Sequence, residues 1–193
     1  KLDDVQSISA SLRYFALGEI QFVSQDAVYQ GQRSPNEFAI DFGYTRLLSE
    51  KFSGAVAIRY IRSDITGGAW DSGSGESVPG NAFATDVAFY FRNEFRSNRK
   101  DNIFTAGINI QNIGSKISYD DGNTKDFIPT TLRLGASYTM EADEYNSFAF
   151  SFEASKLLVP TPPDLNIDTI TGVGIANGIN QDIGPIEGIF KSF

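Results

Sequence analysis

The sequence lacks cysteine and histidine altogether. Without cysteine, neither a disulfide nor a thiolate metal site can form within these 193 residues. Without histidine, the commonest general base and the commonest transition-metal ligand are missing, so no Ser-His-Asp triad can be built from this chain. A protease or deacylase is therefore disfavoured, and we assign no catalytic, cofactor-binding or metal-binding residues.

Long apolar runs and positive charge are also scarce. No segment approaches the ~18–20 consecutive apolar residues of a membrane-spanning helix, and the mean hydropathy is -0.20. The chain has 16 Lys and Arg against 24 Asp and Glu, which gives a net charge of -8. We therefore predict no nucleic-acid partner, because the phosphate backbone selects basic proteins. No starting Met or signal peptide is present, so we expect a mature chain or a piece of a longer one.

Apolar and polar residues alternate along much of the sequence. In the first segment, Ser7 to Leu17, the side chains of Ile8, Leu12 and Tyr14 alternate with serines and Arg13. Six further segments of the same kind begin at Phe38, Phe52, Phe83, Phe104, Leu132 and Phe148. A period of two indicates β-strands with two unlike faces. The segments are about ten to thirteen residues long, whereas globular strands usually have ~5–6.

The two faces of these segments differ in charge. No residue assigned to the apolar parity of these segments is charged, whereas the other parity carries Arg13, Glu37, Asp41, Arg59, Asp86, Arg92, Arg133, Glu141 and Glu153. The opposite, apolar parity carries many Phe and Tyr toward the strand ends, which is typical of the aromatic girdles of transmembrane barrels. We therefore predict an all-β, antiparallel, up-and-down barrel whose apolar face contacts outer-membrane lipid. A soluble β-sandwich with the same parity is the alternative.

Connection lengths alternate strictly between long and short. Outer-membrane barrels have long loops outside the cell and short turns in the periplasm, whereas long structureless loops are unusual in a compact sandwich. The sequence therefore predicts extracellular loops at 18–35, 65–80, 114–128 and 159–193, with the first strand running outward.

Seven strands do not complete such a barrel. Barrels of this class normally have an even number of strands, and an open sheet in lipid would leave two edges of unpaired backbone groups. We therefore expect residues 1–193 to form part of a longer outer-membrane barrel, with strands missing before Lys1 and after Phe193.

Several long blocks resemble a known family. SLRYFALGEIQFVSQDA, GINIQNIGSKISY, DFIPTTLRLGASY and KLLVPTPPDLN are similar to the PorV family of outer-membrane barrels of the type IX secretion system. The resemblance covers nearly all of the chain and implies a FadL-like barrel of about fourteen strands. It also implies a non-enzymatic role: binding exported cargo through its C-terminal signal domain at the translocon barrel (SprA or Sov), then delivering it to the PorU attachment complex.

The loops carry more large apolar side chains than exposed loops need. We predict a partner-binding surface, because exposed apolar patches mark interaction sites. Its candidates are Trp70, Tyr119, Phe127, Ile128, Leu165, Ile167, Ile170, Val173 and Ile175. Alternatively, these side chains fold over the mouth of the barrel and pack on each other. A FadL-type channel for uptake of hydrophobic small molecules is the second functional hypothesis, since it too requires an apolar extracellular end.

Three other patterns favour structural interpretations. The glycines of GVGIANG (172–178) have the wrong spacing for a dinucleotide-binding loop. The acidic residues of DDGNTKD (120–126) do not match the spacing of a calcium-binding EF-hand, so a solvated turn is favoured. The mixed charges on the inward face favour a lattice of salt bridges over an open channel or a catalytic cluster.

Overall fold

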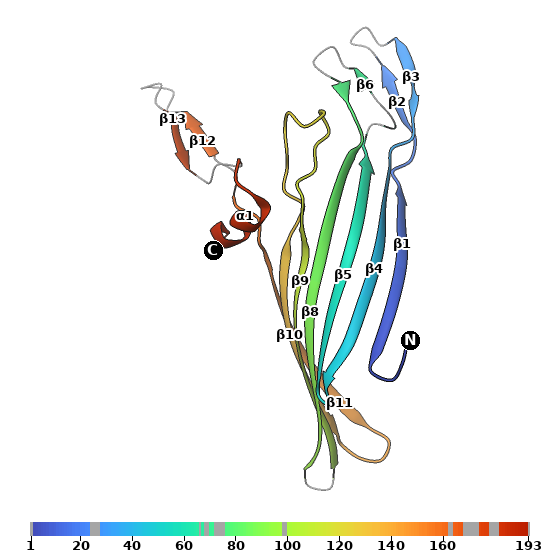
Figure 1. Ribbon diagram of the computed structural model, residues 1–193, viewed down its shortest axis with the longest axis vertical. Helices are drawn as coiled ribbons and strands as arrows, with labels where there is room; N and C mark the ends of the chain where they lie inside the picture. Colours follow the sequence, from blue (N-terminus) through green and yellow to red (C-terminus); the bar gives the residue numbers. More distant parts are fainter. Residues whose placement is uncertain are drawn as a thin grey trace.

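A computed structural model describes residues 2–23, 28–65, 67, 70–71, 76–97, 100–161, 164–167, 174–177 and 182–192. Its main feature is one seven-stranded antiparallel sheet in which each long strand pairs with the next along the chain (Figure 1). The strands, in order, are β1 (Gln6–Ala16), β4 (Asn36–Ser49), β5 (Phe52–Asp64), β8 (Gly80–Ser97), β9 (Lys100–Gly114), β10 (Thr131–Glu141) and β11 (Ser147–Leu157). All seven predicted strands are confirmed.

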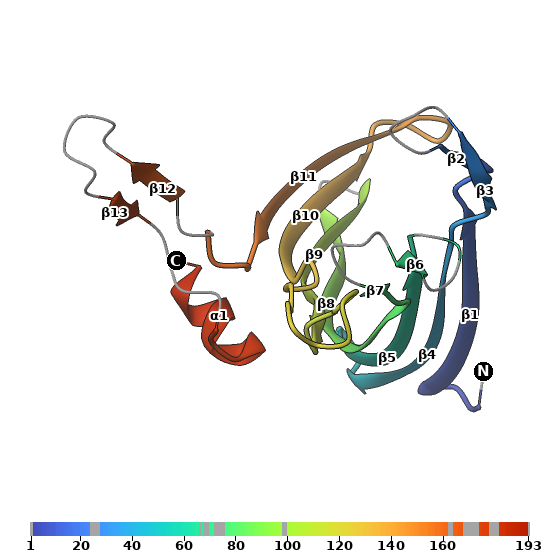
Figure 2. The same cartoon turned by 90° about the horizontal axis from the view of Figure 1, so that it is seen from above.

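The sheet curves into a deep arc that stays open between its first and last strands (Figure 2). Within the described residues, β1 and β11 are each paired on one side only. The predicted all-β, up-and-down architecture is therefore confirmed, and the open arc is the form that a segment of a barrel takes.

The register assigns the two faces. Ile8 lies opposite Tyr44, Leu12 opposite Ile40 and Phe42 opposite Ile58, so the apolar residues of neighbouring strands share one face. Loop side chains pack against the other parity, and these loops lie inside the arc in Figure 2. The apolar parity is therefore convex and the charged parity concave, because side chains alternate strictly along a strand.

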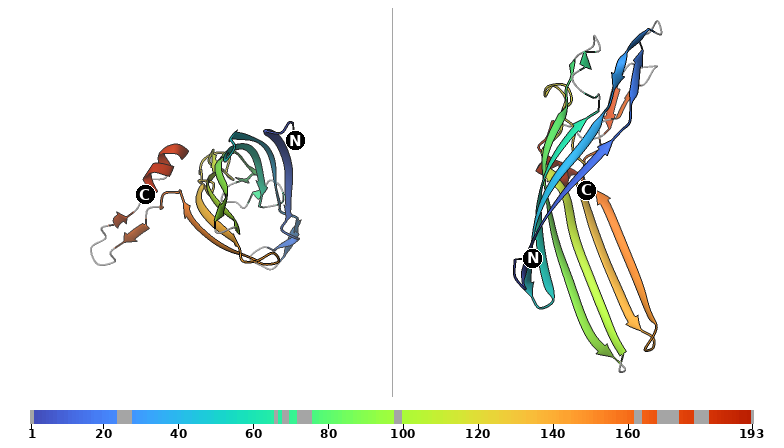
Figure 3. Two further views of the ribbon diagram at one scale, coloured as in Figure 1. Left: turned by 90° about the horizontal axis from the view of Figure 1, so that it is seen from below. Right: turned by 90° about the vertical axis from the view of Figure 1, so that its right-hand side faces the viewer.

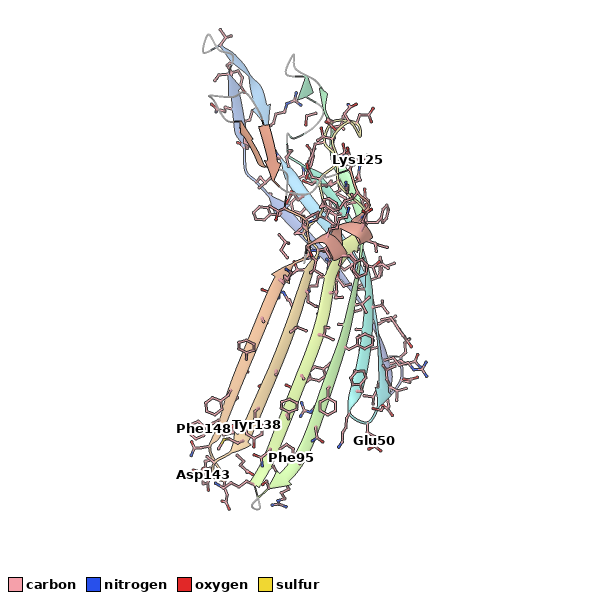
Figure 4. The ribbon with its side chains drawn as sticks, turned by 90° about the vertical axis from the view of Figure 1, so that its left-hand side faces the viewer. Glu50, Phe95, Lys125, Tyr138, Asp143 and Phe148 are labelled. Carbon is pink, nitrogen blue, oxygen red and sulfur yellow. The ribbon has the colours of Figure 1, made fainter. Side chains whose placement is uncertain are left out.

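The convex face is apolar and exposed, and it carries aromatic rings along its length, several of them near the two ends of the strands. Toward the upper end, the Tyr60 ring lies 5.2 Å from that of Phe83 and 6.0 Å from that of Phe38. Toward the lower end, Phe95 contacts Tyr138 at 6.4 Å, and Phe148 lies near them (Figure 4). Between these end rings lies a middle zone of exposed residues such as Val56, Ile58, Ile108 and Leu134, which also contains the rings of Phe42 and Phe89.

Long and short connections lie at opposite ends of the sheet, as the sequence predicts. Short turns follow β4, β8 and β10 at the lower end, and long connections follow β1, β5 and β9 at the upper end (Figure 1). Several of the long connections contain short hairpins. These are β2 (Ile20–Val23) with β3 (Tyr29–Arg33), β6 (Trp70–Asp71) with β7 (Glu76–Ser77), and β12 (Asp164–Ile167) with β13 (Gly174–Asn177).

A single short helix, α1 (Pro185–Lys191), occurs in the described part of the chain. Pro185 at its first position is suited to a helix start, because its fixed φ fits and its missing N–H would have no partner there. In the described ranges no helix has the length and apolar character required to cross a membrane.

Candidate functional site at the mouth of the sheet

The connection between β9 and β10, residues 115–130, folds back over the upper concave face, and we name it the mouth loop. Its two arms are joined by a pair of backbone hydrogen bonds between Ile117 and Asp126, at 2.9 and 2.8 Å. Ile117 and Ile128 are buried against Ala82 and Ala84 of β8. Small alanines on the strand therefore create the space that the larger isoleucines of the loop fill.

A glycine allows the mouth loop to approach this closely. Gly80 opens β8, and a Cβ atom placed on it would lie 2.7 Å from Cγ1 of Ile117 and 2.9 Å from the Ser118 carbonyl oxygen. Real Cβ atoms do not tolerate such distances. The loop is also tied to the preceding connection, because the backbone N–H of Val78 donates to the carbonyl oxygen of Tyr119 at 2.9 Å.

Hydrogen bonds continue from the mouth loop into the sheet. The Tyr119 hydroxyl donates to Oγ of Ser63 on β5 at 3.0 Å, and that serine donates to Oε1 of Glu37 on β4 at 2.6 Å. Ser63 is almost fully buried, and its hydroxyl group both accepts and donates a hydrogen bond within the protein, as buried polar groups usually do. The chain of three groups holds the loop against two strands.

Below this contact, the inward charges form a lattice of ion pairs. Asp41 on β4 accepts from Arg13 on β1 at 3.1 Å and from Nε of Arg59 on β5. Arg59 also donates from Nη2 to Asp86 on β8 at 2.9 Å. Four neighbouring strands are thus joined by alternating charges, and the predicted salt-bridge lattice is confirmed for these residues.

A β-bulge connects the lattice to the mouth loop. The pairing of β8 with β9 shifts between Thr85 and Val87, where Asn112 adopts a φ of 58°. This left-handed conformation is one that asparagine tolerates better than most residues. The backbone N–H of Asn112 donates to Asp86 at 2.7 Å, and its side-chain amide donates to the carbonyl oxygen of Pro129 at 3.1 Å.

The amide oxygen of Asn112 accepts a further hydrogen bond from Nη1 of Arg59, and its backbone carbonyl accepts one from the Thr130 hydroxyl at 2.7 Å. One residue therefore contacts both the ion pairs and the base of the mouth loop. The bulge was not foreseen from the sequence, because NIG in an alternating segment gives no signal that distinguishes it from regular strand.

The mouth loop and the concave face enclose an open pocket of about 570 Å³. Ile61, Ile117, Phe127 and Pro129 contribute apolar walls. The polar lining groups are Arg13, Glu37, Arg59, Ser63, Asn112 and Tyr119. Such a mixture can bind a largely apolar group by burial and orient it by hydrogen bonds, since ligand sites combine apolar walls with a few placed polar groups.

The structure brings three of the predicted site residues together. Tyr119 and Phe127 are half-buried in the pocket wall, while Ile128 is only 6% exposed and belongs to the packed cluster. All three take part in packing at the mouth, and of the three only Ile128 is buried. Phe127 also contacts α1 and has the Lys116 ammonium 4.2 Å above its ring.

The remaining predicted site residues lie in the other connections. The backbones of Trp70, Leu165, Ile167 and Ile175 lie in the short strands β6, β12 and β13, and their side chains are outside the described part. Ile170 and Val173 lie outside the described residues altogether.

The acidic segment 120–126 forms the tip of the mouth loop. The Asp120 carboxylate accepts two hydrogen bonds from Thr124, one from its hydroxyl and one from its backbone N–H at 2.8 Å. It accepts a third from the Ser118 hydroxyl at 2.8 Å. The hydrogen bonds from Thr124 lower the pKa of the Asp120 carboxyl. Both carboxylate oxygens accept hydrogen bonds from the loop itself, which agrees with the expected solvated turn.

A curved up-and-down sheet with an apolar convex face and an ion-paired concave face defines a segment of a β-barrel with a lined mouth. A family model described as type IX secretion system protein PorV matches residues 1–164. The chain therefore belongs to the PorV family of type IX secretion system proteins, as the sequence blocks indicate. No curated protein matches it. The matched region includes all seven long strands, whereas β13 and α1 lie beyond it.

Proposed function

We propose that this type IX secretion system component is an outer-membrane barrel protein that binds exported cargo and passes it on at the cell surface. The observation that carries the proposal is the family match over residues 1–164, which places the chain in the secretion machinery. The proposed partners are the C-terminal signal domains of cargo, the translocon barrel (SprA or Sov) and the PorU attachment complex. No catalytic step is needed for this role.

The convex face supports the membrane location. Its residues are apolar and exposed, and aromatic pairs lie near both ends of the strands, where outer-membrane barrels have their interfacial girdles. The shortest long strands have 11 residues, and a strand of about 9–11 residues crosses a bilayer. In this orientation the long connections and the mouth face the cell exterior, and the short turns face the periplasm.

The mouth supports a binding role. The hairpins β2–β3 and β6–β7 lie with the mouth loop at the upper end of the sheet, the β12–β13 hairpin lies outside the arc, and Tyr119 and Phe127 expose part of their rings in the pocket (Figures 1 and 2). We propose that these two residues, with Trp70, Leu165, Ile167, Ile170, Val173 and Ile175, form the surface that contacts cargo or the translocon. Ile128 would support this surface from beneath, because it is buried.

The pocket also favours a second candidate function. An open volume of about 570 Å³ with apolar walls is large enough for a hydrophobic small molecule, as a FadL-type uptake channel would require. Arg13 and Arg59 of the ion-pair lattice line this pocket, and the lattice joins four neighbouring strands along the wall of the arc.

The two functions are separated by loop variants assayed for both. Trp70→Ser, and the pair Leu165→Ser with Ile167→Ser, should leave the amount of barrel in the outer membrane unchanged. They should weaken capture of a cargo signal domain or of the translocon by ~30-fold for each ~2 kcal/mol lost at a binding hot spot. Tyr145→Ser is the matched control, because Tyr145 is fully exposed in the turn after β10 at the opposite end.

Capture is measured by pull-down from detergent-solubilised outer membrane, and uptake by accumulation of a hydrophobic dye in the same cells. Reduced capture with normal uptake is expected. Normal capture combined with lost uptake would contradict the cargo-binding role and favour the channel.

A further inference from the structure

Helix α1 lies against the outside of the sheet rather than over its mouth. Gly188, its buried residue, faces Phe127 and Pro160, since a Cβ placed on it would lie 2.8 Å from the Phe127 ring. Beside the helix C-terminus, the Lys156 ammonium donates to the carbonyl oxygen of Ser192 at 3.0 Å. Seen from above and from below, α1 lies outside the arc formed by the strands (Figures 2 and 3).

The height of the helix follows from the register. Lys156 on β11 is paired with Leu132 on β10, which is paired with Ile110 on β9, so all three share the convex parity. This row lies near the upper strand ends, two residues above the row that contains Leu134 and the exposed Ile108. Helix α1 therefore borders the upper edge of the exposed apolar zone (Figure 4).

The helix turns its apolar side away from the protein. Ile186 and Phe190 are one turn apart and are 65% and 75% exposed, whereas Gly188 faces Phe127 of the mouth loop and Pro160. Glu187 and Lys191 form an i,i+4 ion pair at 2.7 Å along one flank. A short helix with two large apolar side chains exposed is unfavourable in water, so something apolar is expected to cover them.

We propose that α1 is an interfacial helix whose Ile186 and Phe190 insert into the outer leaflet, at the boundary between headgroups and acyl chains. Two observations favour a lipid surface over a protein. The apolar side continues the exposed convex zone, and two lysines lie beside the helix although the chain as a whole is acidic: Lys156 donates to the Ser192 carbonyl oxygen, and Lys116 lies over the Phe127 ring that Gly188 faces. Apolar insertion with basic residues beside anionic headgroups is how interfacial helices bind membranes.

This inference depends on the proposed membrane location, so the test contains probes for the interfacial helix and a separate probe for the membrane location. The full-length protein, with Trp70→Phe to remove the only tryptophan of these residues, is reconstituted into phosphatidylglycerol–phosphatidylcholine vesicles. Single tryptophans are then introduced as Phe190→Trp, Ile186→Trp, Glu187→Trp and Phe152→Trp. Fluorescence quenching is measured with lipids that carry a nitroxide either near the headgroup or deep in the acyl chain.

We expect Phe190→Trp and Ile186→Trp to be quenched at least about twofold more by the shallow nitroxide than by the deep one. Glu187→Trp, on the flank of the helix, should be quenched less than either. Phe152→Trp, exposed on the convex face of β11, should be quenched by the deep nitroxide and reports on membrane location alone.

The outcomes are distinguishable. If Phe152→Trp is quenched but both helix probes are not, the interfacial helix is overturned while the membrane location stands, and water or protein covers α1 instead. If Phe152→Trp is itself unquenched, the proposed membrane location fails, and the interfacial helix fails with it.

Discussion

The concave face has two sectors whose Arg–carboxylate ion pairs differ in burial and in length. In the sector under the mouth loop, the side chains of Asp41, Arg59 and Asp86 are only 13%, 14% and 15% exposed, and Arg59 contacts both carboxylates. In the sector formed by β10 and β11, Arg133 and Glu153 lie 3.8 Å apart and are 52% and 62% exposed. Both sectors obey the same strand parity, so parity alone does not determine how tightly charges pair.

The difference lies in what surrounds the charges. Arg59 has a carboxylate on each neighbouring strand and a bulge that directs Asn112 toward it, so its donors are used on three neighbouring groups. Arg133 faces an open part of the arc. Removing one partner of a partly desolvated ion pair leaves the other charge uncompensated and destabilises the fold. An exposed ion pair, by contrast, contributes only about 0–1 kcal/mol to the free energy of unfolding.

Replacing the central arginine should have the largest effect. Arg59→Met keeps much of the side-chain volume but leaves Asp41 and Asp86 without their shared cation. We expect the free energy of unfolding to fall by about 3 kcal/mol, because breaking one partner of a buried ion pair leaves uncompensated charge. Urea unfolding of the full-length protein in lipid vesicles, followed by tryptophan fluorescence, measures the change.

Arg133→Met is the matched control in the open sector. It should cost at most about 1 kcal/mol, because its pair is long and solvated. Equal losses for the two variants would show that cover by the mouth loop does not distinguish the sectors.

The next effect concerns the two faces of a single strand. Ile58 is 61% exposed on the convex face of β5, and its neighbour Ala57 points to the concave face. Ile58→Arg should destabilise the barrel by about 2–4 kcal/mol if the residue lies near the membrane midplane. Ala57→Arg should act instead through crowding and charge near Arg59. Normal assembly of Ile58→Arg beside failure of Ala57→Arg, judged by the heat-dependent gel shift of folded barrels, would invert the assignment of faces.

A smaller effect is expected where the mouth loop contacts β8. Gly80→Val would place methyl groups where Ile117 and Tyr119 pack, so the loop must lift, at a cost of about 1–3 kcal/mol. Gly135→Val is the control, because a Cβ at Gly135 meets nothing closer than 3.7 Å. Trypsin cleavage after the exposed Lys125 at the loop tip should accelerate in the first variant only (Figure 4). Equal cleavage rates in the two variants would mean that Gly80 does not hold the loop in place.

The sequence predicts the long strands well because each carries its own signal. Alternation from Phe83 to Arg92 determines both the existence of β8 and which side chains point inward, so the ion pairs of Asp86 and Arg59 follow from parity and neighbouring strands. The family is likewise indicated by local blocks of sequence.

The mouth could not be predicted in the same way, because its structure depends on distant contacts. Arg59 and Asn112 are 53 positions apart, and the left-handed conformation of Asn112 is useful only when Asp86 and Pro129 lie beside it. The short hairpins and α1 have too few residues for a periodic signal, and such elements depend on tertiary contacts for stability. Ile128 therefore looked like a surface residue in sequence, although the packing of the loop buries it.

The smallest expected effect is a pH dependence of the mouth-loop tip. Because hydrogen bonds from Thr124 lower the pKa of Asp120 in the folded loop, their contribution is complete above the ordinary carboxyl pKa and is lost as the pH falls through the lowered value. Amide hydrogen exchange across 118–126, corrected for its intrinsic pH dependence, should therefore accelerate below about pH 4. Asp120→Asn should abolish this pH dependence. Asp143, whose pKa is lowered by the Asn146 side chain in the turn at the opposite end, supplies the control, since Asp143→Asn should alter exchange in that turn alone. Unchanged acid sensitivity of 118–126 in Asp120→Asn would show that another group controls the loop tip.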